Sequence, residues 1–550
     1  MATLDVSGTS SPTIGTMDND KKKTTSPSGL VSSRTSTHEG YTNTQEEEHK
    51  FRWSSLWGHS EVNPINGKSF TFPIFRFWDP YSTAFWLATL GFFVAFLSWF
   101  AFSPLVPEAV RDDLGLTQNQ IIESNLASLS GTMLVRLIAG PACDKYGPRK
   151  VMAVLLILGA VPSGFAALVT NFSGLVAVRF FISILGGTFV PTQAWTTTFF
   201  DKSIVGTVNA FAGGWGNMGG GVTGKNHGPR SPGRHLAVMI GLFERYVHAG
   251  LSARLAWRVC FPTVPVPCLL LVAGMVLLLG KDHPFGKWSM RHQYTGSGLP
   301  VLQGEKVGVE GDKIGDIENS RESGPTTTHA LVDTAQSEPL TKATLFKILT
   351  DARVWMCAVC YLLTFGLETA LDAGLPGLIN TLFASDNFNH VDAAYVASTY
   401  GLLNLFARPL GGVIADILYS RYGLKAKVWW LLGTAISQGI GMIGLGMYIN
   451  YSQATIGGVI GFIILIAITG FAANGAAYAV YGHIRPKNIG AVAGIIGAGG
   501  NVGGIVYTLI FRFQPGSRAA STLGTKFWIS GIVNTVGVLP FFLVSMGDAV

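Results

Sequence analysis

The chain has 550 residues, of which 48% are hydrophobic and only 13% are charged, and its formal net charge is +7. A soluble protein usually carries about 25% charged residues, so this composition excludes an ordinary soluble domain. No nucleic-acid partner is expected either, because the basic residues form no patch with interleaved aromatic residues. Surplus Lys and Arg in a membrane protein more often belong to cytoplasmic loops.

The first part of the chain, residues 1–75, is polar and rich in Ser, Thr and Lys. It contains no apolar run that would serve as a signal peptide, so we expect a disordered cytoplasmic tail. Twelve apolar segments follow, each near the ~20 residues that cross a bilayer core as a helix. They lie at about 82–104, 121–142, 150–170, 174–198, 204–223, 257–280, 353–383, 393–415, 427–448, 454–480, 488–511 and 526–546. The sequence therefore predicts an all-α polytopic membrane protein with twelve transmembrane helices.

A polar stretch between the sixth and seventh segments, residues 281–350, contains no apolar run of spanning length. We interpret it as a cytoplasmic central loop and as a candidate for binding regulatory proteins. It divides the chain into an N-terminal half of six helices, residues 76–280, and a C-terminal half of six helices, residues 351–550.

The short loops indicate how the chain is oriented in the bilayer. Loops that carry several Lys or Arg residues remain on the cytoplasmic side. The loop after the second segment contains Lys145, Arg149 and Lys150, and the loop after the eighth contains Arg421, Lys425 and Lys427. We therefore expect the even-numbered loops and both termini to be cytoplasmic.

The two halves repeat one pattern. Arg136 and Arg408 lie inside apolar segments, and each is followed by Gly after four residues and by Asp after eight. A parallel repeat of six spans is typical of a secondary transporter whose halves rock around a site near the bilayer midplane. The pseudo-symmetry therefore predicts a site between the halves.

The two arginines need an explanation, because a charged side chain in the middle of a bilayer costs roughly 3 kcal/mol or more. One explanation is an ion pair with a buried carboxylate, for which the sequence offers Glu123, Glu368 or Asp372. The other is a binding site, because a planar guanidinium stays charged and presents donors that match a flat oxyanion. Two guanidiniums at pseudo-symmetric positions would hold one small anion from opposite sides.

A glycine-rich octet occurs twice, each time in the fifth segment of a half. The copies are Gly214-Trp-Gly-Asn217-Met-Gly-Gly-Gly221 and Ala498-Gly-Gly-Asn501-Val-Gly-Gly-Ile505. Their signature glycines are Gly216, Gly219, Gly220, Gly500, Gly503 and Gly504. Such glycines permit close helix packing, whereas the amides of Asn217 and Asn501 can hydrogen-bond an oxyanion. A dinucleotide-binding fingerprint is rejected, because no βαβ unit surrounds the first copy and the second breaks the spacing.

Two sets of residues carry a resemblance to known families. The stretch at 140–150, Gly-Pro-Ala-Cys-Asp-Lys-Tyr-Gly-Pro-Arg-Lys, resembles the signature loop of the major facilitator superfamily. The octets, with Arg136 and Arg408, resemble the nitrate/nitrite porter family of that superfamily, most closely the fungal type of eukaryotic high-affinity nitrate transporters. Phe102-Ser-Pro-Leu-Val-Pro107 and Phe406-Ala-Arg-Pro-Leu-Gly-Gly412 add to this resemblance, which covers about residues 60–545.

The resemblance implies a major facilitator fold and a plasma-membrane importer of nitrate, with nitrite as the close alternative. It implies that Arg136 and Arg408 clamp the anion and that three aromatic residues enclose it: Phe189, Tyr361 and Phe365. The alternative for these aromatic residues is lipid-facing or core packing. Proton symport with alternating access is also implied. No metal or cofactor is expected, and no nucleophile–base arrangement is present, so the predicted protein is not an enzyme.

Proton coupling needs a group that can carry a proton. Glu368 and Asp372 lie four residues apart, and hence on one face of the seventh predicted helix, near Tyr361 and Phe365. We expect Glu368 to be the better candidate for the proton carrier and Asp372 to be the second. The alternative is that Glu368 is a static partner of an arginine.

The fifth segment is interrupted by residues 224–236, which contain two prolines, three glycines and five Lys, Arg or His residues. Proline and unpaired charge are both costly in a lipid-exposed helix. Removing this segment would join Thr223 to the apolar run that starts at Ala237 and would restore symmetry with the second half. We interpret it as a retained intron or a gene-model artefact, with a basic extracellular loop as the alternative. If the segment is genuine, transport activity is in doubt, and a transport-deficient nitrate sensor is an alternative function. A nitrate/nitrite exchanger is a further alternative that does not depend on this segment.

Overall fold

The computed structural model describes residues 53–63, 66–105, 109–221, 238–291, 340–385, 388, 390–514 and 522–544. The predicted tail up to residue 52, the segment 224–236 and the central loop from 292 to 339 lie outside the described residues. The helices are η1 Trp53–Leu56, α2 Pro80–Trp99, α3 Phe102–Leu105, α4 Arg111–Leu114, α5 Gln118–Tyr146, α6 Pro148–Phe165, η3 Ala166–Leu168, α7 Phe172–Ile182, η4 Ser183–Thr188, α8 Phe189–Phe199, α9 Val205–Gly221, α10 Val238–His248, α11 Ala253–Thr263, α12 Pro265–Leu279, η5 Trp288–Met290, α13 Lys342–Leu349, α14 Ala352–Phe383, α15 His390–Tyr451, α16 Ile456–Ile484, η7 Pro486–Asn488, α17 Ile489–Phe513, α18 Thr525–Val538 and η9 Leu539–Leu543.

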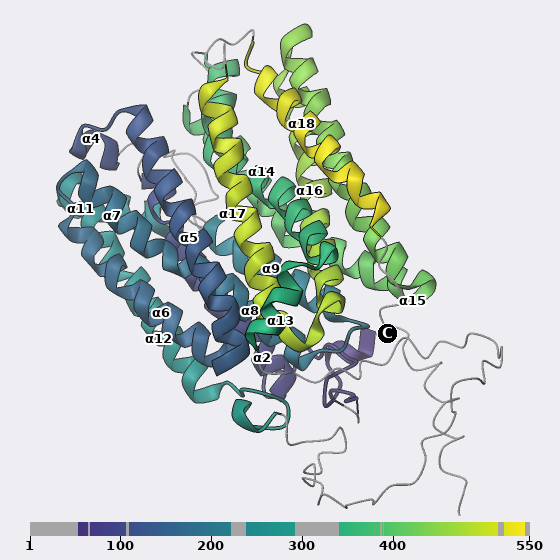
Figure 1. The fold of residues 1–550 in the computed structure, drawn as a ribbon. Coiled ribbons are helices and arrows are strands. Elements are labelled where there is room, and N and C mark those ends of the chain that lie inside the picture. Colours follow the sequence, from purple (N-terminus) through teal and green to yellow (C-terminus); the bar gives the residue numbers. More distant parts are fainter. Residues whose placement is uncertain are drawn as a thin grey trace, which may run out of the picture. The chain divides into compact units, whose positions relative to one another are not determined.

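Ten helical stretches in the described residues are long and apolar enough to cross a membrane. The one in α15 consists of two helices that meet at Gly423, where φ is 74°. In addition, α9 is described for 17 residues as far as Gly221. Each predicted apolar segment thus contains a helix, and the predicted all-α polytopic fold is confirmed (Figure 1).

Several helices begin where the sequence supplies a capping side chain. At the start of α2, the Asp79 carboxylate accepts a hydrogen bond from the backbone N–H of Tyr81 at 2.9 Å. At the start of α5, Thr117 and Gln120 form a reciprocal capping box. Such side chains satisfy the N–H groups that a helix leaves unpaired in its first turn. Local sequence therefore decides where these two spanning helices begin.

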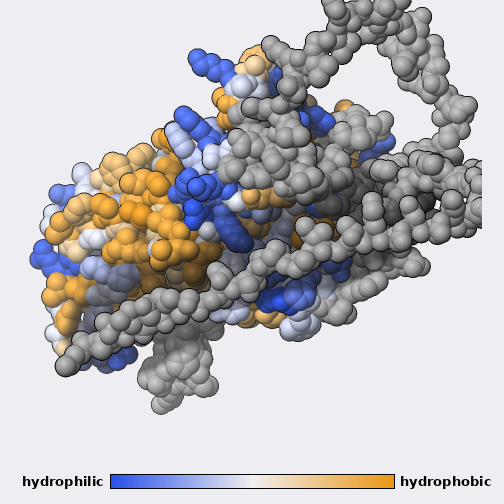
Figure 2. All heavy atoms as spheres, turned by 90° about the horizontal axis from the view of Figure 1, so that it is seen from below, coloured by the Kyte–Doolittle hydropathy of each residue, from blue (hydrophilic) through white to orange (hydrophobic). Residues whose placement is uncertain are grey.

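Large apolar side chains cover the outside of the helical bundle. Ile138 on α5, Leu278 on α12, and Phe406 and Trp429 on α15 are 70%, 85%, 68% and 66% exposed. Figure 2 shows a broad hydrophobic surface, with hydrophilic side chains gathered in separate patches. A surface of this kind would promote association in water but is matched to lipid hydrocarbon. The chain is a multi-pass membrane protein.

Helices from the two halves pack directly against one another within Phe51–Val550, which forms one compact unit. The helix α5 lies against α17, and α9 lies against α15 and α16. Figure 1 shows α5, α6, α7, α11 and α12 on one side and α14, α16, α17 and α18 on the other. A site between the halves would therefore be formed mainly by α5, α9, α14, α15 and α17.

Packed structure begins before residue 76, the predicted start of the first half. The backbone N–H of Ser69 donates to the Phe199 carbonyl at 2.9 Å. The Phe72 ring is buried, with its centre 4.8 Å from that of Phe85 and 5.7 Å from that of Phe200. Residues at the end of the predicted tail are thus held against α2 and the end of α8.

Candidate functional site

Arg136 lies on α5 and is fully buried. Its Nε donates to the Gly186 carbonyl at 2.9 Å, and its Nη1 donates to the Gly497 carbonyl of α17, in the other half, at 2.7 Å. The Nη2 atom has no hydrogen-bond partner among the described residues. No described carboxylate forms an ion pair with this guanidinium. Arg136 therefore keeps a charged donor available for an anion.

Arg408 occupies the equivalent place in the second half, on α15, and is also fully buried. Its Nη2 donates to both oxygens of the Glu368 carboxylate on α14, at 2.7 and 2.5 Å. Its Nη1 donates to the Tyr478 hydroxyl at 3.2 Å, and its Nε has no partner in the described part of the chain. Of the carboxylates that the sequence offers, Glu368 therefore pairs with one of the two arginines.

The three predicted aromatic residues lie beside the arginines. The Cζ of Arg136 lies 4.8 Å from the centre of the Phe189 ring and 5.5 Å from that of Phe365. The Cζ of Arg408 lies 6.0 Å from the same Phe365 ring. Tyr361 stacks on Phe365, with ring centres 4.8 Å apart, and on Phe189 at 5.8 Å. All three rings are buried, which excludes the lipid-facing alternative.

The Glu368 carboxylate is the centre of a buried polar cluster. Asn404 on α15 and Asn474 on α16 donate to it at 2.9 and 2.8 Å. Asn217, from the first octet, donates to it at 3.3 Å. These amides and Arg408 satisfy a carboxylate that would be very costly to bury alone. The first octet thus meets the second arginine through Glu368.

Asn404, Asn474 and Tyr478 are missing from the predicted site, although they touch Glu368 or Arg408. Each is a polar residue within an apolar helix, and this is the signal that could have found them. Many other polar residues share that signal. Only the packing of α14 against α15 and α16 distinguishes these three.

The signature glycines permit close contact between neighbouring helices. A Cβ at Gly219 would collide with the Phe93 carbonyl on α2, and a Cβ at the equivalent Gly503 would collide with the Leu362 carbonyl on α14. The others face side chains: Gly216 faces Phe92, Gly220 faces Phe100, Gly500 faces Tyr361 and Phe365, and Gly504 faces Thr369 and Leu129. Close helix packing therefore accounts for the repeated glycines.

Two predicted residues lie outside the Glu368 cluster. Asn501 is buried on α17 and donates to the Gly497 carbonyl at 3.3 Å, the same carbonyl that Arg136 contacts. Its Oδ1 has no partner among the described residues. Asp372 is exposed and lies one helical turn beyond Glu368 on α14. Asn501 is thus associated with Arg136, whereas Asp372 lies one turn along α14 from the cluster.

The aspartates of the repeated pattern each cap a helix of the other half. Asp144, at the end of α5, accepts from the backbone N–H groups of Gly490 and Ala491 at 2.9 and 2.8 Å. Asp416 accepts from the N–H and the hydroxyl of Thr207 at 2.6 and 2.8 Å. A carboxylate is favoured there by the unpaired N–H groups and the helix dipole. The halves are therefore held together on the side that the loops predict to be cytoplasmic.

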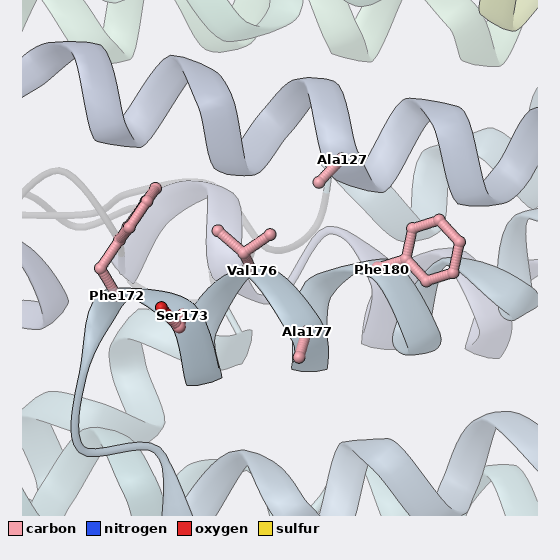
Figure 3. A pocket seen from close by; sticks show the side chains of 6 residues that line it. All are labelled: Ala127, Phe172, Ser173, Val176, Ala177 and Phe180. Atoms are coloured by element: carbon pink, nitrogen blue, oxygen red, sulfur yellow. The ribbon is translucent and has the colours of Figure 1, made fainter.

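A shallow groove of about 340 Å³ lies between α5 and α7, and neither Arg136 nor Arg408 lines it. Figure 3 shows the six residues that do. The groove is lined by Ala127, Phe172, Ser173, Val176, Ala177 and Phe180. No charged side chain lines it, so it offers nothing that would hold an anion. Within the described ranges, no three His, Cys, Asp or Glu residues gather in a way that could hold a metal ion. The arginine cluster is therefore the candidate site.

Comparisons with known proteins show which family this chain is similar to. Residues 88–508 match the family model of the Major Facilitator Superfamily. The "High affinity nitrate transporter 2.5" of Arabidopsis thaliana is 30% identical over 479 residues, which cover 87% of this chain and 82% of that protein. The "Nitrate/nitrite transporter NrtP" of Nostoc punctiforme is 28% identical, with 79% of this chain and 87% of that protein covered. A solved proton:xylose symporter has a TM-score of 0.60 at 15% identity, covering 84% of this chain and 95% of that one.

Proposed function

Because this chain belongs to the Major Facilitator Superfamily, and within it to the family of high-affinity nitrate/nitrite transporters, we propose that it imports nitrate through the site at Arg136 and Arg408. The main support is that the two guanidiniums lie at one aromatic ring, that of Phe365, at 5.5 and 6.0 Å. Each keeps one nitrogen without a partner among the described residues. A planar anion beside this ring would meet charged donors from both halves.

Burial strengthens the attraction of the two arginines for an anion. Both are shielded from solvent, and the buried rings of Phe189, Tyr361 and Phe365 exclude water around them. Charges attract each other several times more strongly in such surroundings than in water. Nitrate also has a suitable shape, because its oxygens lie in one plane like those of a carboxylate, and Arg408 already holds a carboxylate.

A proton on Glu368 would make Arg408 available to nitrate. The ionised carboxylate occupies Nη2 of Arg408, and separating a buried ion pair costs about 3–5 kcal/mol. Protonation removes the negative charge that competes with nitrate. The amide oxygens of Asn217 and Asn404, which have no partner in the described ranges, can accept the new O–H once the amides rotate. Proton binding and nitrate binding would therefore strengthen each other.

The membrane potential makes such coupling necessary for import. An anion that enters a cell with a negative interior must overcome about 2.3 kcal/mol per 100 mV. One accompanying proton cancels this cost, and more than one makes the potential favour entry. Glu368 and Asp372 are the two carboxylates proposed to take part. We place the transporter in the plasma membrane because of its resemblance to nitrate importers, and both termini in the cytoplasm because of the basic short loops.

Nitrate-evoked currents of the full-length chain in a heterologous cell test the binding site. Arg136→Lys and Arg408→Lys keep the charge but lose the planar fork, so both should need far more nitrate for half-maximal current. Wild-type affinity in both variants would contradict the proposed clamp. A deletion of 224–236, measured in parallel, should raise the current if that segment is an artefact. Sequencing the transcript checks that interpretation independently.

Glu368→Gln tests the proposed proton symport. This variant cannot ionise at position 368, so it should lose proton-driven uptake while nitrate exchange across the membrane continues. Nitrate-evoked proton uptake and exchange of isotopically labelled nitrate separate the two activities. Proton-driven uptake equal to wild type would contradict a carrier role for Glu368.

Nitrite is the second candidate substrate, because one relative is named a nitrate/nitrite transporter. Both anions are planar and singly charged, so the same guanidiniums could hold either. Competition between labelled nitrate and unlabelled nitrite measures the preference. Nitrite-for-nitrate counterflow without a proton current would favour exchange over symport.

A further inference from the structure

One polar side chain beside the Glu368 cluster has no role in the site described above. Tyr400, Asn404 and Arg408 follow one another at four-residue intervals, so they share one face of α15. Asn404 and Arg408 both donate to Glu368. Tyr400 lies one turn nearer the start of α15 and is fully buried against the Phe471 ring, with ring centres 5.0 Å apart. Its hydroxyl has no hydrogen-bond partner among the described residues.

The neighbouring helix carries a matching acidic residue. Asp372 lies one turn nearer the end of α14 than Glu368. Because α14 and α15 are consecutive and packed together with a short connection, the end of α14 lies near the start of α15. Asn404, one turn from Tyr400 on the same face of α15, donates to Glu368, so Tyr400 lies beside the part of α14 that leads from Glu368 to Asp372. Tyr400 therefore stands within reach of Glu368 and of Asp372.

The two carboxylates differ in their access to solvent. Glu368 is buried and Asp372 is exposed. Both lie on the face of α14 that meets Asn217 and Arg408, and this face is turned toward other helices. An aspartate exposed to lipid hydrocarbon would be strongly disfavoured, so the exposed side of Asp372 faces water. In the expected orientation that water is extracellular, opposite to the contacts of Asp144 and Asp416.

We propose that Tyr400 and Asn404 line a short path of bound water through which protons pass from Asp372 to Glu368. Buried polar atoms without a protein partner are commonly satisfied by ordered water, which needs two to four polar partners. The Tyr400 hydroxyl, the Asn404 Oδ1 and the Glu368 carboxylate supply them. A hydroxyl can accept one proton and donate another. The proton enters from extracellular water at Asp372 and ends on Glu368, and the groups between them return to their starting state.

This path rests on the proposed proton symport and explains where the proton comes from. The titratable groups around Glu368 are Arg408, which contacts it, Tyr478, which contacts Arg408, and Tyr400 and Asp372, which lie one helical turn from the cluster on α15 and α14. Arg408 is the only positive charge in this set. A proton that reaches Glu368 from the extracellular side therefore makes Arg408 available to nitrate. Nitrate arrives from that same side.

The test uses the full-length chain in a heterologous cell, with Tyr400→Phe and Asp372→Asn. Both variants keep Glu368, Arg408 and Arg136, so labelled nitrate exchange at equal pH on both sides should stay near the wild-type rate. Proton-coupled uptake at saturating nitrate should fall by roughly tenfold at least, because positioned proton donors commonly contribute larger factors than this to a rate. The loss should be largest at high external pH, where protons are scarce. Tyr507→Phe is the matched control.

Tyr507 suits this control because its hydroxyl is also buried and without a partner in the described ranges, but it lies on α17 and interacts with neither carboxylate. Wild-type proton-coupled uptake in both Tyr400→Phe and Asp372→Asn, while Glu368→Gln has lost it, would overturn the path and leave the proposed symport intact. Retained coupling in Glu368→Gln would instead overturn the symport. Should Tyr400→Phe fail to reach the membrane, Asp372→Asn decides, because an exposed residue tolerates that change.

Discussion

Arg136 and Arg408 have equivalent positions in the two halves but different surroundings. Arg136 contacts backbone carbonyls, including one from the opposite half, and no described carboxylate. Arg408 contacts the Glu368 carboxylate within its own half. Repetition of the sequence therefore produced two guanidiniums at one ring but not two identical sites.

This difference suggests separate tasks for the two arginines within the proposed anion site. A guanidinium held by neutral carbonyls stays ready for an anion at every pH. A guanidinium paired with a carboxylate is ready only when that carboxylate is protonated. In the proposed mechanism, the first half supplies affinity and the second half makes binding depend on protons.

The repeated aspartates differ in a similar way. The Asp144 carboxylate accepts from two backbone N–H groups of α17. Asp416 caps α9 and also pairs with Lys427 at 2.8 Å, and the Lys427 side chain is fully buried. The second half thus again contains a buried ion pair where the first half relies on backbone contacts.

The largest effect on stability is expected at this aspartate pair. Asp416→Asn leaves Lys427 buried without its partner, which costs about 3–5 kcal/mol. Asp144→Asn weakens only a helix cap and should cost about 1–2 kcal/mol. Thermal unfolding of the purified full-length chain in detergent measures both. Equal shifts in the unfolding temperature would show that the two halves do not differ here.

Lysine substitutions test the difference between the arginines directly. Each should lower nitrate affinity roughly tenfold to a hundredfold, because hydrogen bonds to charged groups contribute about 1.5–3 kcal/mol. Arg136→Lys should keep the pH dependence of nitrate binding, since the pair of Arg408 and Glu368 remains. Arg408→Lys should make nitrate binding less dependent on pH. Nitrate-evoked currents over a range of external pH give both quantities, and the same pH dependence in the two variants would remove the proposed division of tasks.

The octet glycines should behave alike in both halves. Gly219→Ala and Gly503→Ala each push a methyl group into a backbone carbonyl of the neighbouring helix, which should cost about 1–3 kcal/mol. Gly457→Ala is the control, because an added Cβ there meets no atom within 4 Å. The amount of folded protein in detergent compares the three variants. If Gly219→Ala left the amount of folded protein unchanged while Gly503→Ala reduced it, the first octet would be packed less closely than the second.

The smallest effect is expected at Tyr361, one of the three aromatic residues beside the arginines. Tyr361→Phe keeps the ring that stacks on Phe365 and removes the hydroxyl contact with Tyr478, which is 2.9 Å long. A single neutral hydrogen bond contributes about 1 kcal/mol, so nitrate affinity should fall by no more than about fivefold. The nitrate concentration that gives half-maximal current measures this loss of affinity. A loss as large as that of an arginine variant would give the hydroxyl a direct role in binding the anion.

The helical architecture could be predicted because its signals are local. Runs of about 20 apolar residues and the spacing after Arg136 and Arg408 are visible without any tertiary contact. The arginines and the octet asparagines were also visible, because charge and amide groups stand out in apolar segments. Tyr361 and Phe365 came from a family resemblance, since buried and lipid-facing aromatic residues look alike in one sequence.

The amino-acid sequence by itself determined the spans, the repeat and the two charges that any fold of this chain must satisfy. Tertiary structure alone decided that Glu368 pairs with Arg408 and that Asn404, Asn474 and Tyr478 surround them. The physical reason is that an apolar helix in lipid has no polar stripe that fixes its rotation. Which side chains meet depends on how helices from distant parts of the chain pack, and glycines such as Gly219 and Gly503 set how closely they do so.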